Sequence, residues 1–208
     1  MKYNTDNVRI ISSAPMVSPN TLIKKIPQSA KASKGVFSAR QVIKEILYGE
    51  DKRLMVLVGP CSIHDTKAAI EYANKLVKLK EELDEDLFIV MRVYFEKPRT
   101  TVGWKGLIND PYLDESFDID KGLATARKLL SDLGEIGMPV GVEYLDVLTP
   151  QYLSDLISWG AIGARTTESQ SHRELASALS CPVGFKNGTS GSLDIAIDAI
   201  LSANSPHH

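Results

Sequence analysis

The chain has 208 residues, of which 43% are apolar and 24% charged, and its formal net charge is −2, a composition typical of one soluble globular domain. Because acidic and basic residues nearly balance, we expect local clusters of cations to bind a small anion, with no nucleic-acid or membrane partner. The N-terminus lacks an apolar signal-peptide core and no apolar run approaches the ~20 residues of a membrane span, which predicts a cytoplasmic protein.

The first 35 residues are rich in Ser, Pro and Lys and predict an N-terminal arm outside the main repeat. One patch in this arm, residues 8–11, is strand-like. A helix is expected next, with Ser38 as its N-cap and Gly49 at its end. Residues 36–208 are therefore expected to form the main domain.

In the main domain, short apolar runs alternate with stretches whose apolar residues recur at helical spacing. The predicted strands are residues 54–59, 87–92, 140–143, 161–164 and 182–185. The predicted helices lie near residues 39–48, 66–83, 119–136, 150–157, 172–179 and 193–200. Asp65 and Thr149 are placed to cap two of these helices, and Gly137 is placed to end a third.

Five alternations of strand and helix, with strands too uniformly apolar for an antiparallel sheet, predict a parallel α/β protein. Periodicity alone leaves a doubly wound sheet and a (β/α)₈ barrel both open. Neither a G-x-G-x-x-G turn nor a Walker loop is present to favour nucleotide binding.

Each predicted strand delivers one chemically reactive or charged residue to its carboxyl end. These residues are Cys61, Arg92, Glu143, Arg165 and Lys186. The carboxyl ends of parallel strands meet at one side of the sheet, where functional residues of α/β folds gather. Taken singly, Cys61 is more typical of a small buried side chain, and Glu143 would simply balance nearby cations.

The loop after the second strand adds further cations. Lys97, Arg99 and Lys105 follow Arg92 within fourteen residues and face a single acid, Glu96. Guanidinium and ammonium groups bind phosphate or carboxylate by charge-assisted hydrogen bonds. A solvated basic loop is the alternative interpretation of this stretch alone, but the strand-end pattern favours an anion-binding site.

Four long motifs resemble the microbial, feedback-regulated class I type of 3-deoxy-D-arabino-heptulosonate 7-phosphate (DAHP) synthase. They cover residues 59–65 (GPCSIHD), 92–111, 160–170 and 182–189 (PVGFKNGT). The resemblance extends over essentially the whole chain. It implies a (β/α)₈ TIM barrel of which this chain supplies about five βα units, residues 36–208, with residues 1–35 as a regulatory or oligomerisation arm.

The resemblance also implies the first step of the shikimate pathway, the condensation of phosphoenolpyruvate with D-erythrose 4-phosphate. A divalent metal (Mn, Fe, Co or Zn) polarises the aldehyde, the enol carbon attacks it, water adds and phosphate leaves. Cys61 matches a metal ligand of the family. The residues that match the phosphoenolpyruvate site are Arg92, Glu143, Ala164, Arg165 and Lys186, and those that match the erythrose 4-phosphate site are Lys97, Arg99 and Thr100.

Of these residues, Lys97, Lys186 and Arg92 are the expected catalytic ones, and Lys105 joins the substrate-binding set. An aromatic amino-acid effector is implied as well. Its expected contacts are Asp6, Asn7, Pro150, Gln151 and Ser180, with Asn7 in place of an acidic residue found in some relatives. The effector would bind between the arm and the barrel of a neighbouring subunit in a homodimer or homotetramer.

The sequence given ends at His208, whereas members of this family run further. A His, a Glu and an Asp that complete the metal site, and one more phosphate-binding Arg, belong to that further part. The alternative hypothesis is therefore a truncated, non-catalytic fragment that binds a phospho-ligand or effector. We also expect the outer edges of the first and fifth strands to lack partners and to promote association.

Overall fold

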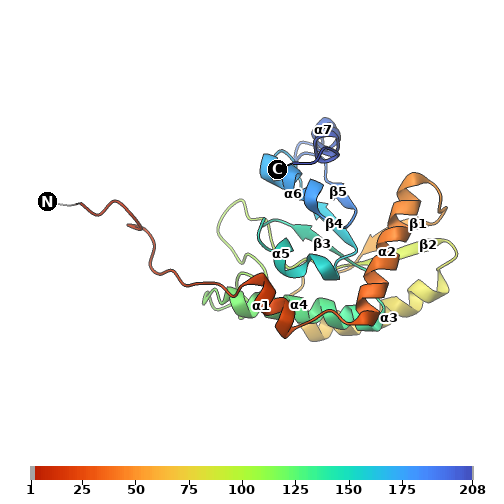
Figure 1. Cartoon of the computed structure of the whole chain (residues 1–208), viewed down its shortest axis with the longest axis horizontal. Coiled ribbons are helices and arrows are strands. Elements are labelled where there is room, and N and C mark those ends of the chain that lie inside the picture. Colours follow the sequence, from red (N-terminus) through yellow and green to blue (C-terminus); the bar gives the residue numbers. More distant parts are fainter. Residues whose placement is uncertain (1–2, 208) are drawn as a thin grey trace.

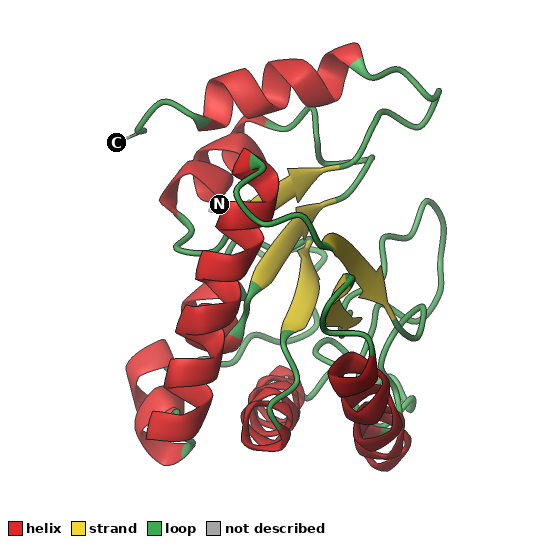
Figure 2. Ribbon diagram, turned by 90° about the vertical axis from the view of Figure 1, so that its right-hand side faces the viewer, coloured by secondary structure: helices red, strands yellow, loops and turns green. Residues whose placement is uncertain are grey.

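The computed structural model describes residues 3–207, so residues 1 and 2 of the predicted arm and His208 at the end of the predicted barrel part lie outside it. Five parallel strands form one curled sheet in the order β1-β2-β3-β4-β5 (Figures 1 and 2). The strands are β1 Leu54–Val58, β2 Leu87–Arg92, β3 Val140–Tyr144, β4 Trp159–Ile162 and β5 Val183–Phe185. The predicted α/β class, with five βα units, is confirmed.

Helices connect the strands and cover the sheet (Figure 2). They are α1 Pro19–Lys25, α2 Ala30–Tyr48, α3 Thr66–Glu82, α4 Ile119–Ile136, α5 Pro150–Leu153 with a 3₁₀ turn at Ser154–Leu156, α6 Gln170–Ala178 and α7 Asp194–Ala203. The main core lies between α3, α4 and the strands β2 and β3, and it includes Leu123, Leu130, Met91 and Val142. No helix within residues 3–207 is long and apolar enough to span a bilayer.

Three predicted helix boundaries are confirmed by their capping geometry. The Asp65 carboxylate accepts hydrogen bonds from the amides of Lys67 (2.8 Å) and Ala68 (3.2 Å) at the start of α3. Gly49 and Gly137 end α2 and α4 with φ of 76° and 85°, the left-handed conformation that glycine adopts without steric cost.

The prediction that Ser38 caps α2 is wrong, because the helix begins two turns earlier. The Ser29 hydroxyl accepts the hydrogen bond of the Ala32 amide (3.0 Å), and Ser38 lies inside the helix. Ala32 and Val36 are buried and extend the apolar face of α2 toward its N-terminus. The placement of the arm boundary at residue 35 stays a prediction.

The predicted strand at residues 8–11 is also wrong. No strand lies beside this segment, and Val8, Ile10 and Ile11 are all exposed in an extended tail that leaves the body of the protein (Figure 1). A strand needs a neighbour for its backbone hydrogen bonds, and the described residues offer none here.

Two smaller predictions hold only in part. Thr149 is the N-cap residue of α5 and Pro150 begins the helix, as predicted, but the Thr149 side chain makes no cap bond. The Asp146 carboxylate instead accepts from the amides of Leu148 (2.5 Å) and Thr149 (3.3 Å). The fourth strand lies at Trp159–Ile162 rather than 161–164. Gly163 and Ala164 belong to the following turn, where the amides of Thr166 and Thr167 both donate to the Gly163 carbonyl.

A buried arginine joins the N-terminal segment to the main domain. Arg127 on α4 has no exposed surface and makes a two-pronged ion pair with Asp155 (2.7 and 2.8 Å). Its other hydrogen bonds go to the carbonyl oxygens of Ile26 and Tyr152, both at 2.7 Å. This bonding satisfies the buried charge and fixes the chain between α1 and α2 against α4 and α5.

Candidate anion-binding site at the carboxyl ends of the strands

The sheet register brings the predicted site residues to one side of the protein. Arg92, the last residue of β2, lies beside Gly141 of β3, and Glu143 of β3 lies beside Ala161 of β4. The Lys186 amide continues the β4–β5 ladder by donating to Ile162 (3.0 Å). The polar side chains are therefore carried by rigid strand ends.

The loop after β1 contacts the end of β2 through both backbone and side chain. Arg92 donates from Nε to the Pro60 carbonyl and from Nη2 to the Cys61 carbonyl, each at 3.1 Å. Gly59 permits this approach, since a Cβ at residue 59 would lie 2.8 Å from the Arg92 carbonyl oxygen. These contacts place the exposed Cys61 next to the cations.

Lys97 completes a thiol–ammonium pair with Cys61. Its Nζ donates to the Cys61 Sγ at 2.9 Å. This hydrogen bond and the Lys97 charge lower the pKa of the Cys61 thiol, with smaller contributions from Arg92 and Lys186. The thiolate, the form that reacts and binds metals, is thus stabilised.

Lys186 pairs with the buried carboxylate of Glu143. The site has no room for a side chain at residue 163, where an added Cβ would lie 2.4 Å from the Glu143 Oε1. Glycine at that position lets the turn after β4 pass directly over the carboxylate. Glu143 therefore holds one of the cations and does more than balance charge at a distance.

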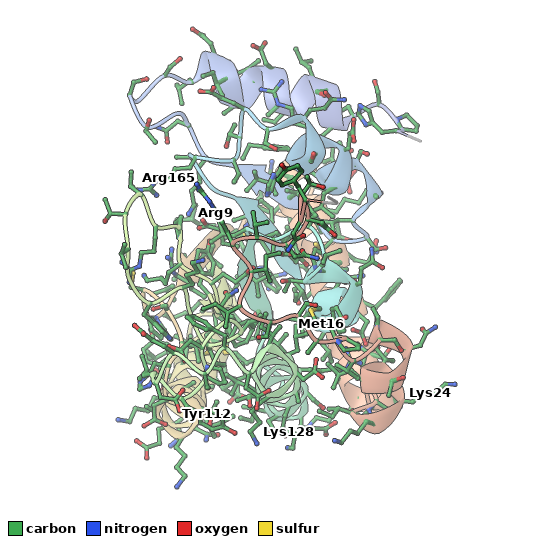
Figure 3. All side chains as sticks on the ribbon, turned by 90° about the vertical axis from the view of Figure 1, so that its left-hand side faces the viewer. Arg9, Met16, Lys24, Tyr112, Lys128 and Arg165 are labelled. Carbon is green, nitrogen blue, oxygen red and sulfur yellow. The ribbon has the colours of Figure 1, made fainter. Side chains whose placement is uncertain are left out.

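A pocket of about 290 Å³ is lined by residues of the long loop after β2 and of the segments that follow β3 and β4. Four cationic side chains line it: Lys97, Arg99, Lys105 and Arg165. They come from the loop after β2 and the turn after β4, and Arg165 is exposed (Figure 3). A pocket with four converging cations is suited to a phosphate group.

The long loop is shaped by internal contacts that turn these cations toward the pocket. The Lys97 amide donates to the Lys105 carbonyl (2.8 Å), and Arg99 Nε donates to the Trp104 carbonyl (2.8 Å). Gly106 is required where the two arms of this loop pair through an antiparallel bridge between Glu96 and Gly106, because a Cβ at residue 106 would lie 2.0 Å from the Phe95 carbonyl oxygen.

The same pocket contains a buried acid. Glu96 is 7% exposed, and its pKa is raised to about 7, chiefly by burial and then by the charge of Asp146. The backbone amides of Leu145 and Asp146 oppose this rise, and the Glu143 charge adds to it. A carboxyl group with this pKa is only partly ionised at neutral pH.

Other predicted residues lie farther from this centre. Thr100 is exposed in the loop and is not part of the pocket lining, and Ala164 is half-buried in the turn after β4. Among the predicted effector contacts, Pro150 is buried and Gln151 exposed on α5, and Ser180 is exposed after α6. Asp6 and Asn7 are exposed in the N-terminal segment, which leaves the body of the protein as an extended tail (Figure 1).

The described residues do not make a metal centre by themselves. Within residues 3–207 no group of three or more His, Cys, Asp or Glu side chains is arranged to hold a metal ion. Cys61 offers one thiolate, whereas protein metal sites of this kind use three or four ligands.

Two contributors were not predicted from the sequence. The ring of Tyr94 lies against Arg92 and Lys186. The hydroxyl of the fully buried Thr167 lies 2.9 Å from the Gly163 carbonyl and 2.8 Å from the Lys186 carbonyl, and it ties the ends of β4 and β5 together. Tyr94 stands two residues after Arg92, a spacing that could have indicated a shared face.

This chain is similar in sequence and in structure to proteins of one known family. The sequence model of the DAHP synthetase I family matches residues 25–208. The Phe-sensitive phospho-2-dehydro-3-deoxyheptonate aldolase of Escherichia coli K12 is 60% identical over 207 residues, which are 100% of this chain and 59% of the relative. A Trp-sensitive aldolase of the same name from Buchnera aphidicola is 57% identical over 203 residues, covering 98% of this chain and 58% of the relative.

Among solved structures, the phospho-2-dehydro-3-deoxyheptonate aldolase of Francisella tularensis superposes with a TM-score of 0.94 at 55% identity. The match covers 96% of this chain and 58% of that one. This chain thus spans well under two thirds of the length of these relatives.

Proposed function

Because this chain belongs to the DAHP synthetase I family, we propose that its anion-binding site takes phosphoenolpyruvate and D-erythrose 4-phosphate, the substrates of a DAHP synthase. In that reaction the enol carbon of phosphoenolpyruvate forms a bond to the aldehyde carbon, water adds to the substituted carbon, and inorganic phosphate leaves. The two substrates carry two phosphates and a carboxylate between them.

The observation that carries this proposal is the convergence of cations from three strand ends. Arg92 and Lys186 share the ring of Tyr94, and Lys97, which contacts Cys61, lines the pocket together with Arg99, Lys105 and Arg165. We assign phosphoenolpyruvate to Arg92, Arg165 and Lys186. The sugar phosphate is assigned to Arg99 and Thr100.

Lys97 has the central role in this proposal, between the two substrates. Its ammonium donates a hydrogen bond to whichever oxygen develops negative charge as the carbon–carbon bond forms, and such preorganised donors lower the barrier most in a site shielded from water. Lys186 and Arg92 hold the departing phosphate. A divalent metal, Mn, Fe, Co or Zn, stays part of the proposal with Cys61 as its one ligand from this chain.

Regulation by an aromatic amino acid is also proposed. The relatives are named Phe-sensitive and Trp-sensitive, and the exposed Gln151 and Ser180 are available to contact an effector. Asp6 and Asn7 would reach this effector from a second copy in a homodimer or homotetramer, because the tail leaves its own body. The proposed compartment is the cytoplasm.

The test is phosphoenolpyruvate binding by calorimetry, then its consumption with erythrose 4-phosphate and Mn²⁺, on a chain of verified mass. Lys97→Met should weaken binding or turnover. The matched control is Lys128→Met, which removes a cation from the outer face of α4 (Figure 3). Binding without turnover would favour the non-catalytic fragment, and an absence of binding in the parent chain would contradict the proposal.

A further inference from the structure

Tyr94 lies beneath two of the site's cations. The Arg92 guanidinium carbon is 3.7 Å from the centroid of its ring, and the Lys186 Nζ is 5.2 Å from the same centroid. Both distances are within the ~6 Å over which an aromatic face attracts a cation. The residue is only 2% exposed, so water competes little for this contact.

We propose that Tyr94 is a positioning residue of the anion site, whose ring holds Arg92 and Lys186 in place while leaving their charge available to a bound anion. The part of this inference that concerns phosphoenolpyruvate rests on the proposed function. The placement of the two cations by the ring does not.

The bonding of Arg92 is the main argument. Two of its donors bind backbone carbonyl oxygens, at Pro60 and Cys61, and its guanidinium carbon lies over the ring of Tyr94. Among the ion pairs found within residues 3–207, none includes Arg92. The guanidinium is thus oriented by neutral groups alone, and an incoming anion does not have to displace a carboxylate.

Lys186 shows the contrasting case. Its ammonium is paired with Glu143, which cancels part of its field, and Tyr94 supplies the additional contact. Two cations gathered on one ring repel each other, and the quadrupole of the ring face offsets part of this repulsion without adding a net charge.

The phenol must stay neutral for this role, and its surroundings ensure that it does. Burial raises the pKa of Tyr94, and the neighbouring Arg92 opposes this only in part. The backbone at Tyr94 is tied to the loop that carries Cys61, since the Tyr94 carbonyl accepts a hydrogen bond from the Ile63 amide (2.8 Å), and burial of the residue restricts its ring.

A fluorination series separates the electronic role of the ring from its packing. Tyr94 is replaced by Phe, and then by Phe analogues with one, two and three ring fluorines, which reduce the cation attraction of the face and leave the ring size almost unchanged. Affinities for inorganic phosphate and for phosphoenolpyruvate are measured for each. We expect Tyr94→Phe to bind like the parent and the trifluorinated form to bind about three- to tenfold more weakly.

A ligand-free measurement keeps the inference independent of the proposed function. The ring current of Tyr94 should shift the NMR signal of the Arg92 Hε upfield, in the parent and in Tyr94→Phe, and Tyr94→Leu should abolish the shift. The control is Phe95→Leu, which removes the neighbouring buried ring; within residues 3–207 no cation lies over that ring. That variant should leave the Arg92 signal shifted.

The outcomes are distinguishable. An Arg92 signal without the upfield shift in the parent would overturn the inference. It would also be overturned if the parent and all the ring variants bound phosphate and phosphoenolpyruvate with equal affinity. A shifted Arg92 signal in a chain that binds no phosphoenolpyruvate would support the positioning role and contradict the proposed function.

Discussion

Replacing Glu96 by Gln should make the stability of this chain less dependent on pH. Glu96 is buried in the pocket that the four cations line. Two further acids, Asp146 and Glu143, are close enough to affect its pKa. Burial dominates, and it raises the pKa of this carboxyl from 4.5 to about 7. The folded protein therefore binds this proton more tightly than the unfolded chain does.

The sign and size follow from this difference in proton binding. Between pH 4.5 and 7 the folded state holds the proton and the unfolded state releases it, so the free energy of unfolding falls as the pH rises. A rise of the pKa from 4.5 to about 7 corresponds to ~3 kcal/mol over the whole window. Between pH 5 and 8 the expected loss is about 2.5 kcal/mol, and Gln, which does not titrate, should remove it.

The assay is urea unfolding at pH 5, 6, 7 and 8 for the parent chain, Glu96→Gln and Glu168→Gln. Glu168 is an exposed acid in the turn after β4 and serves as the control. The free-energy difference between Glu96→Gln and the parent should change with pH by about 2.5 kcal/mol, and Glu168→Gln shows how much of such a change comes from removing any one acid. If Glu96→Gln kept the pH dependence of the parent, the buried, proton-binding role of Glu96 would be refuted.

Three further predictions concern the site and the sheet edge. Lys186→Ala should weaken phosphoenolpyruvate binding about ten- to a hundredfold in calorimetry, because one charge-assisted hydrogen bond is lost, and unchanged affinity would contradict the assignment. Lys97→Met should raise the pKa of the Cys61 thiol, whose thiolate the Lys97 hydrogen bond stabilises. The pH profile of Cys61 alkylation by iodoacetamide, measured with a chelator present, should then shift to higher pH. An unshifted profile would disprove the pairing of Lys97 with Cys61. Leu54→Lys on the outer edge of β1, 66% exposed, should reduce self-association in sedimentation runs, since a charge there opposes edge-to-edge pairing.

The strands and most helices were predictable because local patterns determine them. Continuous apolar runs, the Asp65 cap and the αL glycines at residues 49 and 137 are short-range signals. The start of α2 was not predictable in this way. Ser29 and Ser38 are both acceptable caps, and the choice between them depends on burying Ala32 and Val36 against the rest of the fold.

The sequence was sufficient to predict which residues gather at the site, because parallel strands all end on the same side of the sheet. The pairing of those residues was not predictable. Lys97 contacts Cys61 through the path of a long loop. Glu143 pairs with Lys186, which follows a strand two positions away in the sheet, and the turn at Gly163 packs closely on its carboxylate. The pattern of charged residues in the sequence does not mark Tyr94, because its proposed role depends on where its ring lies relative to two cations.

The arrangement of charges at the site favours the proposed binding of anions. Arg92 is held by carbonyl groups and a ring, all of them neutral. Glu96, which would otherwise cancel a cation, is kept partly protonated at neutral pH by burial. Glu143 is ionically paired with Lys186, where it supports the lysine rather than neutralising the pocket around Arg165. Raising the pH above 7 ionises Glu96 fully and should therefore weaken anion binding in the parent chain, and Glu96→Gln should bind with less dependence on pH across the same range.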